Sequence, residues 1–216
     1  ESREHLMQTE KLALVGKLAA GVAHSIRNPL TSVKMRLFSL ERSLVLMPPQ
    51  REDLDVISEE IRHLDTIIRN FLEFSRRPKL KFSPVSPSSV VDMTLELLHH
   101  RLESSGVEVA VDRDRQLPEI NGDPDQLKEA LVNLILNSCE AMSGGGRIRI
   151  VEETGYIEPV GDVAIVTLID SGPGIPPSLR EKVFQPFFTT KGEGTGLGLP
   201  IAKRIFEEHG GWLHLK

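Results

Sequence analysis

A histidine on a predicted helix is the first side chain in this sequence that could do covalent chemistry. His24 stands in the run Ala-His-Ser-Ile-Arg-Asn-Pro. The apolar stripe of the helix passes through Ile26, so His24 points away from the stripe and shares a face with Asn28, one turn later. A neutral imidazole can act as a nucleophile or a base near neutral pH. A solvated surface histidine is the simpler interpretation, while the polar row beside the helix-breaking Pro29 favours a function.

Two asparagines one helical turn apart form the second candidate site. Asn133 and Asn137 share a face of an otherwise apolar helix, predicted for residues 124–142. Buried amides need hydrogen-bond partners, so the pair could simply bind nearby backbone. Their oxygens are also hard ligands of the kind that Mg²⁺ accepts, together with waters and phosphates. The pair on its own leaves both interpretations open.

An aspartate and two glycines follow a predicted strand. The apolar run 163–169 leads into Asp170, Gly172 and Gly174. Such an ending places a carboxylate at the mouth of a sheet, where the glycines let a planar ligand approach the backbone. A plain turn would explain the glycines but would not require the aspartate. Its carboxylate suits an exocyclic amine such as that of adenine.

Glycines at every second position precede the last predicted helix. Residues 192–198 are Gly-Glu-Gly-Thr-Gly-Leu-Gly. The amides of such a loop, with the helix N-terminus behind it, can bind phosphate. The spacing fits neither a dinucleotide-binding Gly-x-Gly-x-x-Gly nor a Walker A loop. A glycine linker beside core aromatic residues is the alternative to a mobile lid anchored by those residues, which are Phe184, Phe187 and Phe188.

Two long amphipathic helices are predicted to carry His24. Apolar residues three and four apart predict one helix up to about residue 46, and a more regular seam predicts a second from Leu54 to Ser75. The run Met-Pro-Pro-Gln at 47–50 breaks the pattern, so the helices form an antiparallel hairpin. A hairpin cannot cover both stripes by itself, whereas a four-helix bundle made with a second copy can. We therefore expect a homodimer.

The rest of the chain predicts an α+β layer. Residues 75–89 contain three prolines and no periodicity, and we interpret them as the linker between a domain at 1–83 and a domain at 84–216. Mixed elements without strict alternation favour one sheet beneath a few helices. The predicted helices are 88–104, 124–142 and 199–209, and the predicted strands are 107–111, 147–152 and 163–169.

Composition and charge limit the class of protein. The chain has 216 residues and a net charge of −5, with +3 on residues 1–83 and −8 on residues 84–216. The acidic second half repels phosphate backbones, so we expect no nucleic-acid partner. The single Cys139 fits a reducing compartment, and no run approaches the roughly 18 apolar residues of a membrane span. We expect a cytoplasmic location, with membrane attachment only through segments absent from this chain.

The order of these motifs resembles the bacterial two-component sensor histidine kinases. His-x-x-x-Asn-Pro, Asn-x-x-x-Asn, Asp-x-Gly-x-Gly, the phenylalanine-rich segment and the glycine loop are similar to the H, N, G1, F and G2 boxes, and they cover nearly the whole chain. The runs at 16–24 and 137–142 look similar to the branch with the nitrogen-regulation and acetoacetate-response sensors. The resemblance implies a dimerisation and histidine-phosphotransfer hairpin, followed by a Bergerat-type α/β sandwich that binds ATP.

The resemblance assigns the chemistry of the hairpin to His24. By analogy this residue attacks the γ-phosphate of ATP, and a response-regulator receiver domain then takes the phosphoryl group on an aspartate. The family usually has an acidic residue next, where this chain has Ser25. A hydroxyl cannot offset the charge that develops on the ring, so we expect slow autophosphorylation. Asn28 either orients a water for phosphatase action on the regulator or caps backbone disturbed by Pro29.

The other motifs are assigned by resemblance to Mg²⁺ and ATP. Asn133 and Asn137 would coordinate the metal, and Asp170 would accept a hydrogen bond from the exocyclic amine of adenine. Further nucleotide contacts would come from the two glycine-rich segments, at Gly172, Gly174, Lys191, Gly194, Thr195, Gly196, Leu197 and Gly198. Residues 209–216 begin like a strand, where the family usually continues with a closing hairpin. We therefore expect a catalytic core that is excised from a longer receptor and truncated at that hairpin.

Two other functions compete with the kinase. Bergerat-fold ATPases and clamps, such as type II topoisomerases and heat-shock chaperones, typically have a glutamate at the position of Asn133, and an amide cannot take a proton from water. A non-catalytic dimer scaffold or a phosphatase-biased sensor is the other alternative, with Ser25 as its evidence. His24 and Asn133 together favour the kinase.

Overall fold

The computed structural model describes residues 25–44, 47–75, 79–191 and 194–215, so that His24 lies outside the described residues. The chain divides into two compact units. The hairpin unit consists of Glu1–Pro78 with Thr190–Leu197, and the sheet unit consists of Lys79–Thr189 with Gly198–Lys216.

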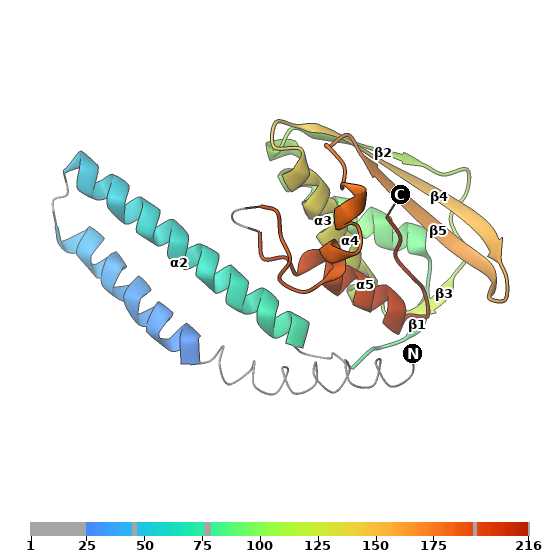
Figure 1. The fold of residues 1–216 in the computed structure, drawn as a ribbon, viewed down its shortest axis with the longest axis horizontal. Helices are drawn as coiled ribbons and strands as arrows, with labels where there is room; N and C mark the ends of the chain where they lie inside the picture. Colours follow the sequence, from blue (N-terminus) through green and yellow to red (C-terminus); the bar gives the residue numbers. More distant parts are fainter. Residues whose placement is uncertain (1–24, 45–46, 76–78, 192–193, 216) are drawn as a thin grey trace. The chain divides into compact units, whose positions relative to one another are not determined.

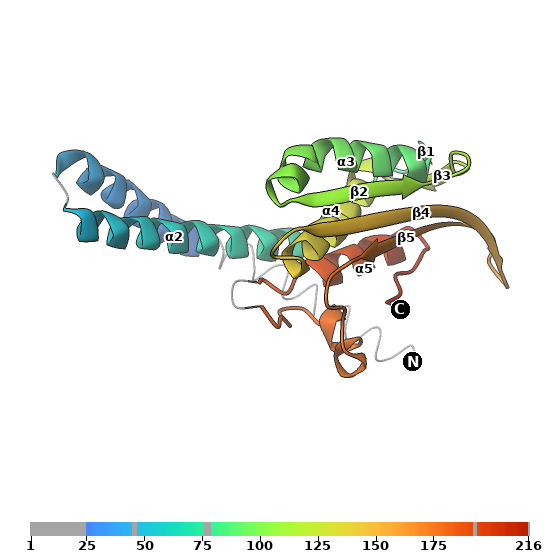
Figure 2. The same cartoon turned by 90° about the horizontal axis from the view of Figure 1, so that it is seen from above.

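Two helices form most of the described part of the hairpin unit. One covers residues 25–43 and the other, α2, spans Pro48–Ser75; they lie side by side and antiparallel (Figure 1, Figure 2). The predicted break is present, but Pro48 and Pro49 begin α2 instead of forming the turn. Proline is tolerated there because the first N–H groups of a helix have no helical partner. The Gln50 side chain accepts a hydrogen bond from the Met47 N–H at 3.0 Å, as in a capping box.

The apolar stripes of these two helices stay largely exposed within one chain. Among the described side chains of the hairpin, the buried hydrophobic residues are Ile61 and Ile68. Many large apolar side chains of the same helices are exposed, namely Ile26, Val33, Met35, Phe38, Leu40, Val56, Ile57 and Leu64. The predicted helical hairpin is confirmed, and most of the large apolar side chains described on it remain exposed.

Three α-helices, two sheets and two short 3-10 helices, η1 (Pro177–Leu179) and η2 (Lys182–Phe184), form the described sheet unit. The helices are α3 (Pro87–Ser104), α4 (Pro124–Ala141) and α5 (Gly198–Glu208). In the larger sheet, β4 (Gly146–Ile157) lies between β2 (Val107–Asp112), which runs parallel to it, and β5 (Gly161–Asp170), which runs antiparallel. In the smaller sheet, β1 (Ser83–Val85) pairs antiparallel with β3 (Ile120–Gly122). The predicted α+β fold is confirmed, with the helices on one face of the larger sheet (Figure 1).

Alternation along β4 separates the core from solvent. Ile148 and Ile150 are buried, whereas Arg149 between them faces outward and pairs with Asp112 of β2 at 2.5 Å. A period of two on the strand and of 3.6 on each helix brings one apolar face of every element to a common interior. The helices contribute the buried residues Val90, Val91, Leu98, Ala130, Leu131, Ile135, Ile201, Ala202 and Ile205.

Some elements differ from their predicted bounds. Strand β1 and the first turns of α3 lie within the segment predicted as linker. The prediction of an unstructured linker was wrong here because it relied on the prolines. Pro84 is accommodated in a two-stranded sheet, and Pro87 lies in the first turn of a helix. β4 and β5 are longer than predicted, with 12 and 10 residues. Residues 209–216 were expected to begin a strand, and the described residues 209–215 form none.

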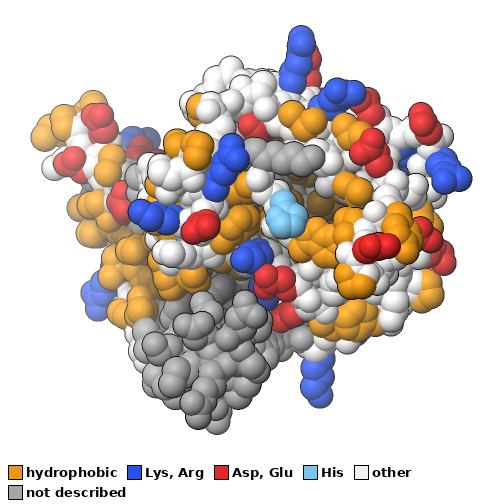
Figure 3. Space-filling view, turned by 45° about the vertical axis from the view of Figure 1, so that its right-hand side comes forward, with side chains coloured by type: hydrophobic (Ala, Val, Ile, Leu, Met, Phe, Trp, Pro, Cys, Tyr) orange, Lys and Arg blue, Asp and Glu red, His pale blue; other side chains and the backbone are white. Residues whose placement is uncertain are grey.

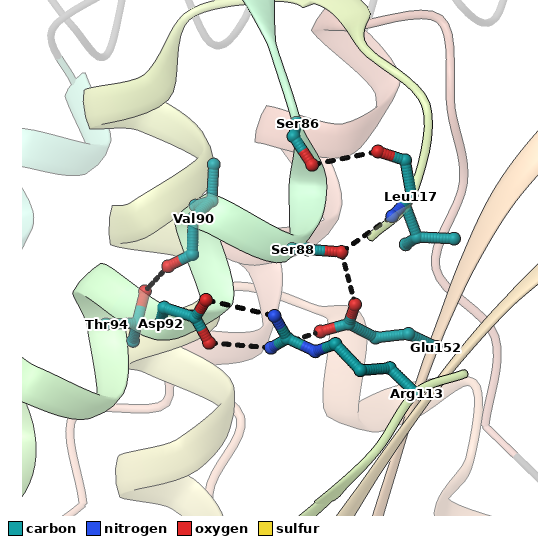
Figure 4. A network of polar contacts seen from close by, with 8 residues as sticks. All are labelled: Ser86, Ser88, Val90, Asp92, Thr94, Arg113, Leu117 and Glu152. Atoms are coloured by element: carbon teal, nitrogen blue, oxygen red, sulfur yellow. Dashed lines mark hydrogen bonds and ion pairs between the residues drawn. The ribbon is translucent and has the colours of Figure 1, made fainter. Parts of the chain in front are cut away.

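A buried polar network ties α3 to β4 (Figure 4). The carboxylate of Glu152 is fully buried and accepts a hydrogen bond from the Ser88 hydroxyl. Its other oxygen forms an ion pair, without hydrogen-bond geometry, with Arg113 at 2.9 Å. Arg113 also donates to both oxygens of Asp92, at 2.6 and 2.9 Å, and this hydrogen bonding is the main reason why the pKa of Arg113 is raised. A buried carboxylate needs such partners, and the sequence pattern did not reveal them.

The described surface mixes several kinds of side chain. Figure 3 shows acidic, basic and hydrophobic side chains interspersed across one face. Among the helices that the structure describes, none combines the length and the apolar character needed to cross a bilayer.

Candidate functional site

The carboxylate of Asp170 is held from two sides at the end of β5. Its Oδ1 accepts a hydrogen bond from the Gly172 N–H at 2.9 Å, and its Oδ2 accepts one from the Ser138 hydroxyl at 2.9 Å. Ser138 belongs to α4, so the bond joins this helix to the strand end. Two donors on two different oxygens fix the plane of the carboxylate. Asp170 is half-buried, which leaves it accessible to a ligand.

Glycine is required at position 172. A Cβ there would lie 2.8 Å from Asp170 Oδ1 and 3.4 Å from Ala141 Cβ. The first distance is shorter than ordinary contacts allow, so any side chain would displace the carboxylate from the Gly172 N–H. Gly174 has φ of +73°, in the region that side chains disfavour. The turn at the glycines and the hydrogen bond that orients the Asp170 carboxylate are thus parts of one geometry.

Asn133 presents its amide oxygen to the start of α5. Its Nδ2 donates to the Glu129 carbonyl at 3.0 Å, which fixes the orientation of the amide. Its Oδ1 lies 3.4 Å from the place where a Cβ of Gly198 would stand, and Gly198 is the first residue of α5. Asn137, one turn further along α4, is also half-buried. The two asparagines are therefore part of the packed sheet unit and not of its open surface.

A capped N-terminus fixes the start of α4. Asp123 accepts hydrogen bonds from the N–H groups of Asp125 and Gln126 at 3.1 and 3.3 Å, and from that of Lys81 at 2.7 Å. Burial tends to raise the pKa of Asp123, but these N–H donors outweigh burial and hold the pKa below its ordinary value. Lys81 precedes β1, so the same carboxylate anchors the entry of the chain into the sheet unit.

His209 completes this junction. Its Nε2 accepts a hydrogen bond from the Asp123 N–H at 2.9 Å, while its Nδ1 lies 2.7 Å from the Ile205 carbonyl. The ring therefore carries its proton on Nδ1, where it donates to that carbonyl. Phe82 packs against the ring with centroids 5.2 Å apart. These contacts give His209 a structural role at the junction of α4 and α5.

The structure describes residues 190–191 and 194–197 of the loop before α5. The Gly194 N–H donates to the Lys191 carbonyl at 3.4 Å, and Gly196 has φ of +63°. Leu197 is fully buried, and the predicted contact residues Lys191, Gly194 and Thr195 are half-buried. These residues belong to the hairpin unit, whereas Gly198 belongs to the sheet unit.

The described neighbours of His24 lie on an exposed helix face. Ser25 and Asn28 are both exposed, at the start of the helix of residues 25–43. That helix continues unbroken through Pro29, where a kink was expected from the missing N–H. Thr31, two residues on, donates its hydroxyl to the Arg27 carbonyl at 2.9 Å. His24 itself, the predicted nucleophile, lies outside the described residues.

Sequence reasoning overlooked Ser138. It is 4% exposed and follows Asn137 directly on α4. A small polar residue in an otherwise apolar helical run was the available signal, but its partner on β5 could not be inferred from α4 alone. The adjacent Cys139 is buried, and burial raises the pKa of its thiol, so it stays protonated and is a poor nucleophile.

The described donor set suits a nucleotide better than an isolated metal ion. Among the described residues, no group of three or more His, Cys, Asp or Glu side chains could hold a metal. Asn133 and Asn137 offer neutral oxygens, and Mg²⁺ takes the rest of its shell from waters and phosphates. These residues fit a cation that arrives with phosphates.

Two family matches divide the chain in the same order as the motifs. Residues 14–79 match the family described as "His Kinase A (phospho-acceptor) domain". Residues 122–216 match the family described as "Histidine kinase-, DNA gyrase B-, and HSP90-like ATPase".

Curated relatives cover the whole chain. The signal transduction histidine-protein kinase AtoS of Escherichia coli K12 is 39% identical over 215 residues, which are 98% of this chain and 34% of that protein. The sensor histidine kinase ZraS of Salmonella typhimurium is 35% identical over 218 residues, which are 100% of this chain and 46% of that protein. The chain thus spans about a third to a half of the length of these relatives. The likeness to AtoS agrees with the branch expected from the sequence.

Two solved histidine kinase structures are similar to most of this chain. The crystal structure of histidine kinase ThkA in complex with response regulator protein TrrA has a TM-score of 0.67 and 29% identity, and the match covers 97% of this chain and 60% of that one. Full-length ShkA in complex with AMPPNP has a TM-score of 0.68 and 27% identity, covering 90% and 41%.

Proposed function

The chain belongs to the two-component sensor histidine kinases, and from this premise we propose that it transfers the γ-phosphoryl group of ATP to its own His24. An aspartate on the receiver domain of a response regulator then takes the group from the histidine. The observation that carries the nucleotide half of the proposal is the Asp170 carboxylate, which Ser138 and Gly172 hold from two sides.

In this proposal, Asp170 selects adenine by a hydrogen bond to the base. An ionised carboxylate only accepts hydrogen bonds, so it matches the exocyclic amine of adenine and opposes the carbonyl that guanine has in its place. Each oxygen of Asp170 has one donor within the protein and a lone pair left for a ligand. ATP is therefore favoured over GTP.

Asn133 and Asn137 hold Mg²⁺ in this proposal, but only as part of a nucleotide complex. The oxygen of Asn133 is already oriented by the bond of its Nδ2 to Glu129. Two neutral ligands bind a divalent cation weakly, so its affinity depends on the phosphates. The bound cation would neutralise phosphate charge. Lys191 and the residues 194–198 are proposed to contact the phosphates through the lysine charge and the loop amides.

His24 supplies the nucleophile. One imidazole nitrogen forms the N–P bond with the γ-phosphorus while the bond to the bridging oxygen breaks and ADP leaves. The ring becomes positively charged and then loses the proton of its other nitrogen. Ser25 can accept a hydrogen bond from that N–H but carries no charge, so the rate is low compared with a variant that has a carboxylate there.

The proposed partners are a second copy of the chain and a receiver domain. The exposed stripes of the helix at residues 25–43 and of α2 are apolar surface that a four-helix bundle would cover. The ThkA complex with its response regulator supports a receiver domain as the partner. This phosphorelay is proposed to operate in the cytoplasm.

Incubation with γ-labelled ATP and Mg²⁺ tests the proposal. We expect label on the protein that is lost in acid and kept in base, as a phosphoramidate is, and no label on His24→Gln. Asp170→Asn, which removes the base contact, should also lose most of the label. Release of free phosphate without labelled protein would instead identify an ATPase and contradict the kinase.

A further inference from the structure

We propose that Ser138 is a positioning residue that orients Asp170 toward the adenine amine and so contributes to the choice of base. This inference rests on the proposed function, because it assumes that Asp170 reads the base. Ser138 itself acts through the carboxylate and contacts it with its hydroxyl at 2.9 Å.

The geometry gives the two anchors of Asp170 different tasks. The Gly172 N–H is a backbone donor two residues away and fixes only Oδ1. With that anchor alone, the carboxylate could still turn about its bond to Cβ, because terminal carboxylate torsions are broad. The Ser138 hydroxyl fixes Oδ2 from another element, α4. Hydrogen bonds to both oxygens are needed to fix the plane of the carboxylate. The amine of a planar base can form a well-aligned hydrogen bond with only one orientation of that plane.

The direction of the Ser138 hydrogen bond is determined by the partner. An ionised carboxylate can only accept, so the hydroxyl must donate to Oδ2 and keeps its own lone pairs. At 4% exposure, Ser138 is shielded from water that could replace the bond. Loss of the hydroxyl would leave Oδ2 with room for rotation and would weaken its alignment with an amine.

The same bond links the two proposed halves of the nucleotide site. Ser138 follows Asn137 and lies on the helix that also carries Asn133. The base contact at the end of β5 is thereby attached to the helix that carries the proposed Mg²⁺ ligands. A shift of α4 would move both sets of groups together.

Ser88 provides a matched control within the same unit. It is fully buried and donates its hydroxyl to the carboxylate of Glu152, so it makes the same kind of contact in the network that joins α3 to β4 (Figure 4). Loss of this hydroxyl should lower stability without changing the choice of nucleotide. A difference between the two serines would separate positioning from ordinary packing.

The experiment uses Ser138→Ala and the full chain, with calorimetric titration of ATP and of purine riboside triphosphate, which lacks the exocyclic amine. We expect Ser138→Ala to weaken ATP binding about tenfold, as loss of a hydrogen bond to a charged group does, and to change binding of the analogue less than about twofold. Ser138→Cys keeps the size of the side chain but is a weak hydrogen-bond donor, so it should change the two affinities as Ser138→Ala does. It replaces Ser138→Ala in the test if that variant does not fold. Ser88→Ala should have a lower melting temperature than the original chain and unchanged affinities for ATP and for the analogue.

Four outcomes would contradict the inference in different ways. Equal weakening of ATP and the analogue in the Ser138 variants would make the serine a general structural residue. Unchanged affinities would remove its role altogether. If the unmutated chain binds ATP and the analogue equally, the assignment of Asp170 as the base contact fails, and the inference fails with that part of the proposed function. Discrimination by the unmutated chain that the Ser138 variants retain would overturn only the inference.

Discussion

The hairpin unit and the sheet unit both contain amphipathic helices, but the two units differ in how far the apolar faces of these helices are buried. In the sheet unit, α3, α4 and α5 bury their apolar faces against one another and against β4, where Ile148 is 1% exposed. In the hairpin, Ile57 is 45% exposed and Leu40 46%, although they belong to equally regular stripes. The pattern of a helix therefore shows that it needs a partner but does not show where the partner is. The sheet unit finds it in its own chain, and we propose that the hairpin finds it in a second copy.

The polar residues differ in the same way. Ser25 and Asn28 lie exposed on the helix of residues 25–43. Asp170, Asn133 and Asp123 are each fixed by hydrogen bonds to other residues of the sheet unit. Substitutions in the hairpin should therefore act through assembly and rate, and those in the sheet unit through stability and nucleotide binding.

The largest expected effect is the loss of the hairpin in Ile61→Lys. Ile61 is buried within one chain, so an unpaired charge there should cost about 3 to 5 kcal/mol and remove both helicity and dimerisation. Ile57→Lys, at an exposed position of the same stripe, should keep the helices and weaken only the dimer. Circular dichroism and sedimentation measure the two properties. A chain without substitutions that sediments as a monomer at micromolar concentration would refute the four-helix bundle.

Arg113→Met should destabilise the sheet unit by a similar or slightly smaller amount, about 3 kcal/mol, because it leaves the carboxylate of Glu152 buried without its cation. Thermal unfolding should show the sheet-unit transition moving down while the hairpin transition stays. Arg149→Met removes an exposed ion pair of the same kind and should change stability by less than about 1 kcal/mol. Equal effects of the two variants would show that the buried network contributes no more to the free energy of unfolding than an exposed ion pair does.

Ser25→Glu and Asn28→Ala should separate two activities of the hairpin. A carboxylate beside His24 would stabilise the charge on the ring and accelerate autophosphorylation by roughly 10- to 100-fold, with ATP affinity unchanged. Asn28→Ala should lose phosphatase activity toward the regulator and keep the kinase. The labelling rate, the dephosphorylation rate and the melting temperature are measured together. A parallel fall of both activities in Asn28→Ala, with lower helix stability, would favour a capping role.

A smaller, pH-dependent effect is expected at the start of α4. Because the pKa of Asp123 is held below its ordinary value of 3.8, its charge stabilises the folded state fully above about pH 4. That contribution is lost as the pH falls through the lowered pKa. Asp123→Asn keeps a capping side chain but loses the charge, so it should lower stability by about 1 kcal/mol at pH 7.

Denaturant titrations at several pH values test this. The difference between Asp123→Asn and the original chain should shrink as the pH falls below 4. Asp125→Asn changes an exposed carboxylate and serves as the control. A difference that stays constant with pH would show that the charge of Asp123 contributes nothing.

The comparison also shows which features sequence reasoning can predict. The helices, the hairpin and the ordered motifs follow from periodicity and residue type, which are local. The Ser138–Asp170 bond and the Ser88–Glu152 contact join residues 32 and 64 positions apart, so they exist only once the sheet unit has packed. β1 and β3 have three residues each and show no periodicity, and their pairing is equally non-local. Pro48 was predicted as a break and begins a helix, because proline fits both places.

The most direct test of the account follows ATP affinity and the autophosphorylation rate per chain in the same samples, over about a hundredfold range of protein concentration. A nucleotide site whose contacts all come from one chain predicts an ATP affinity that does not depend on protein concentration. A hairpin completed by a second copy predicts a rate per chain that rises with concentration to a plateau, with Ile57→Lys shifting the rise to higher concentration. A labelling rate per chain that stays constant while sedimentation shows monomers would contradict the account.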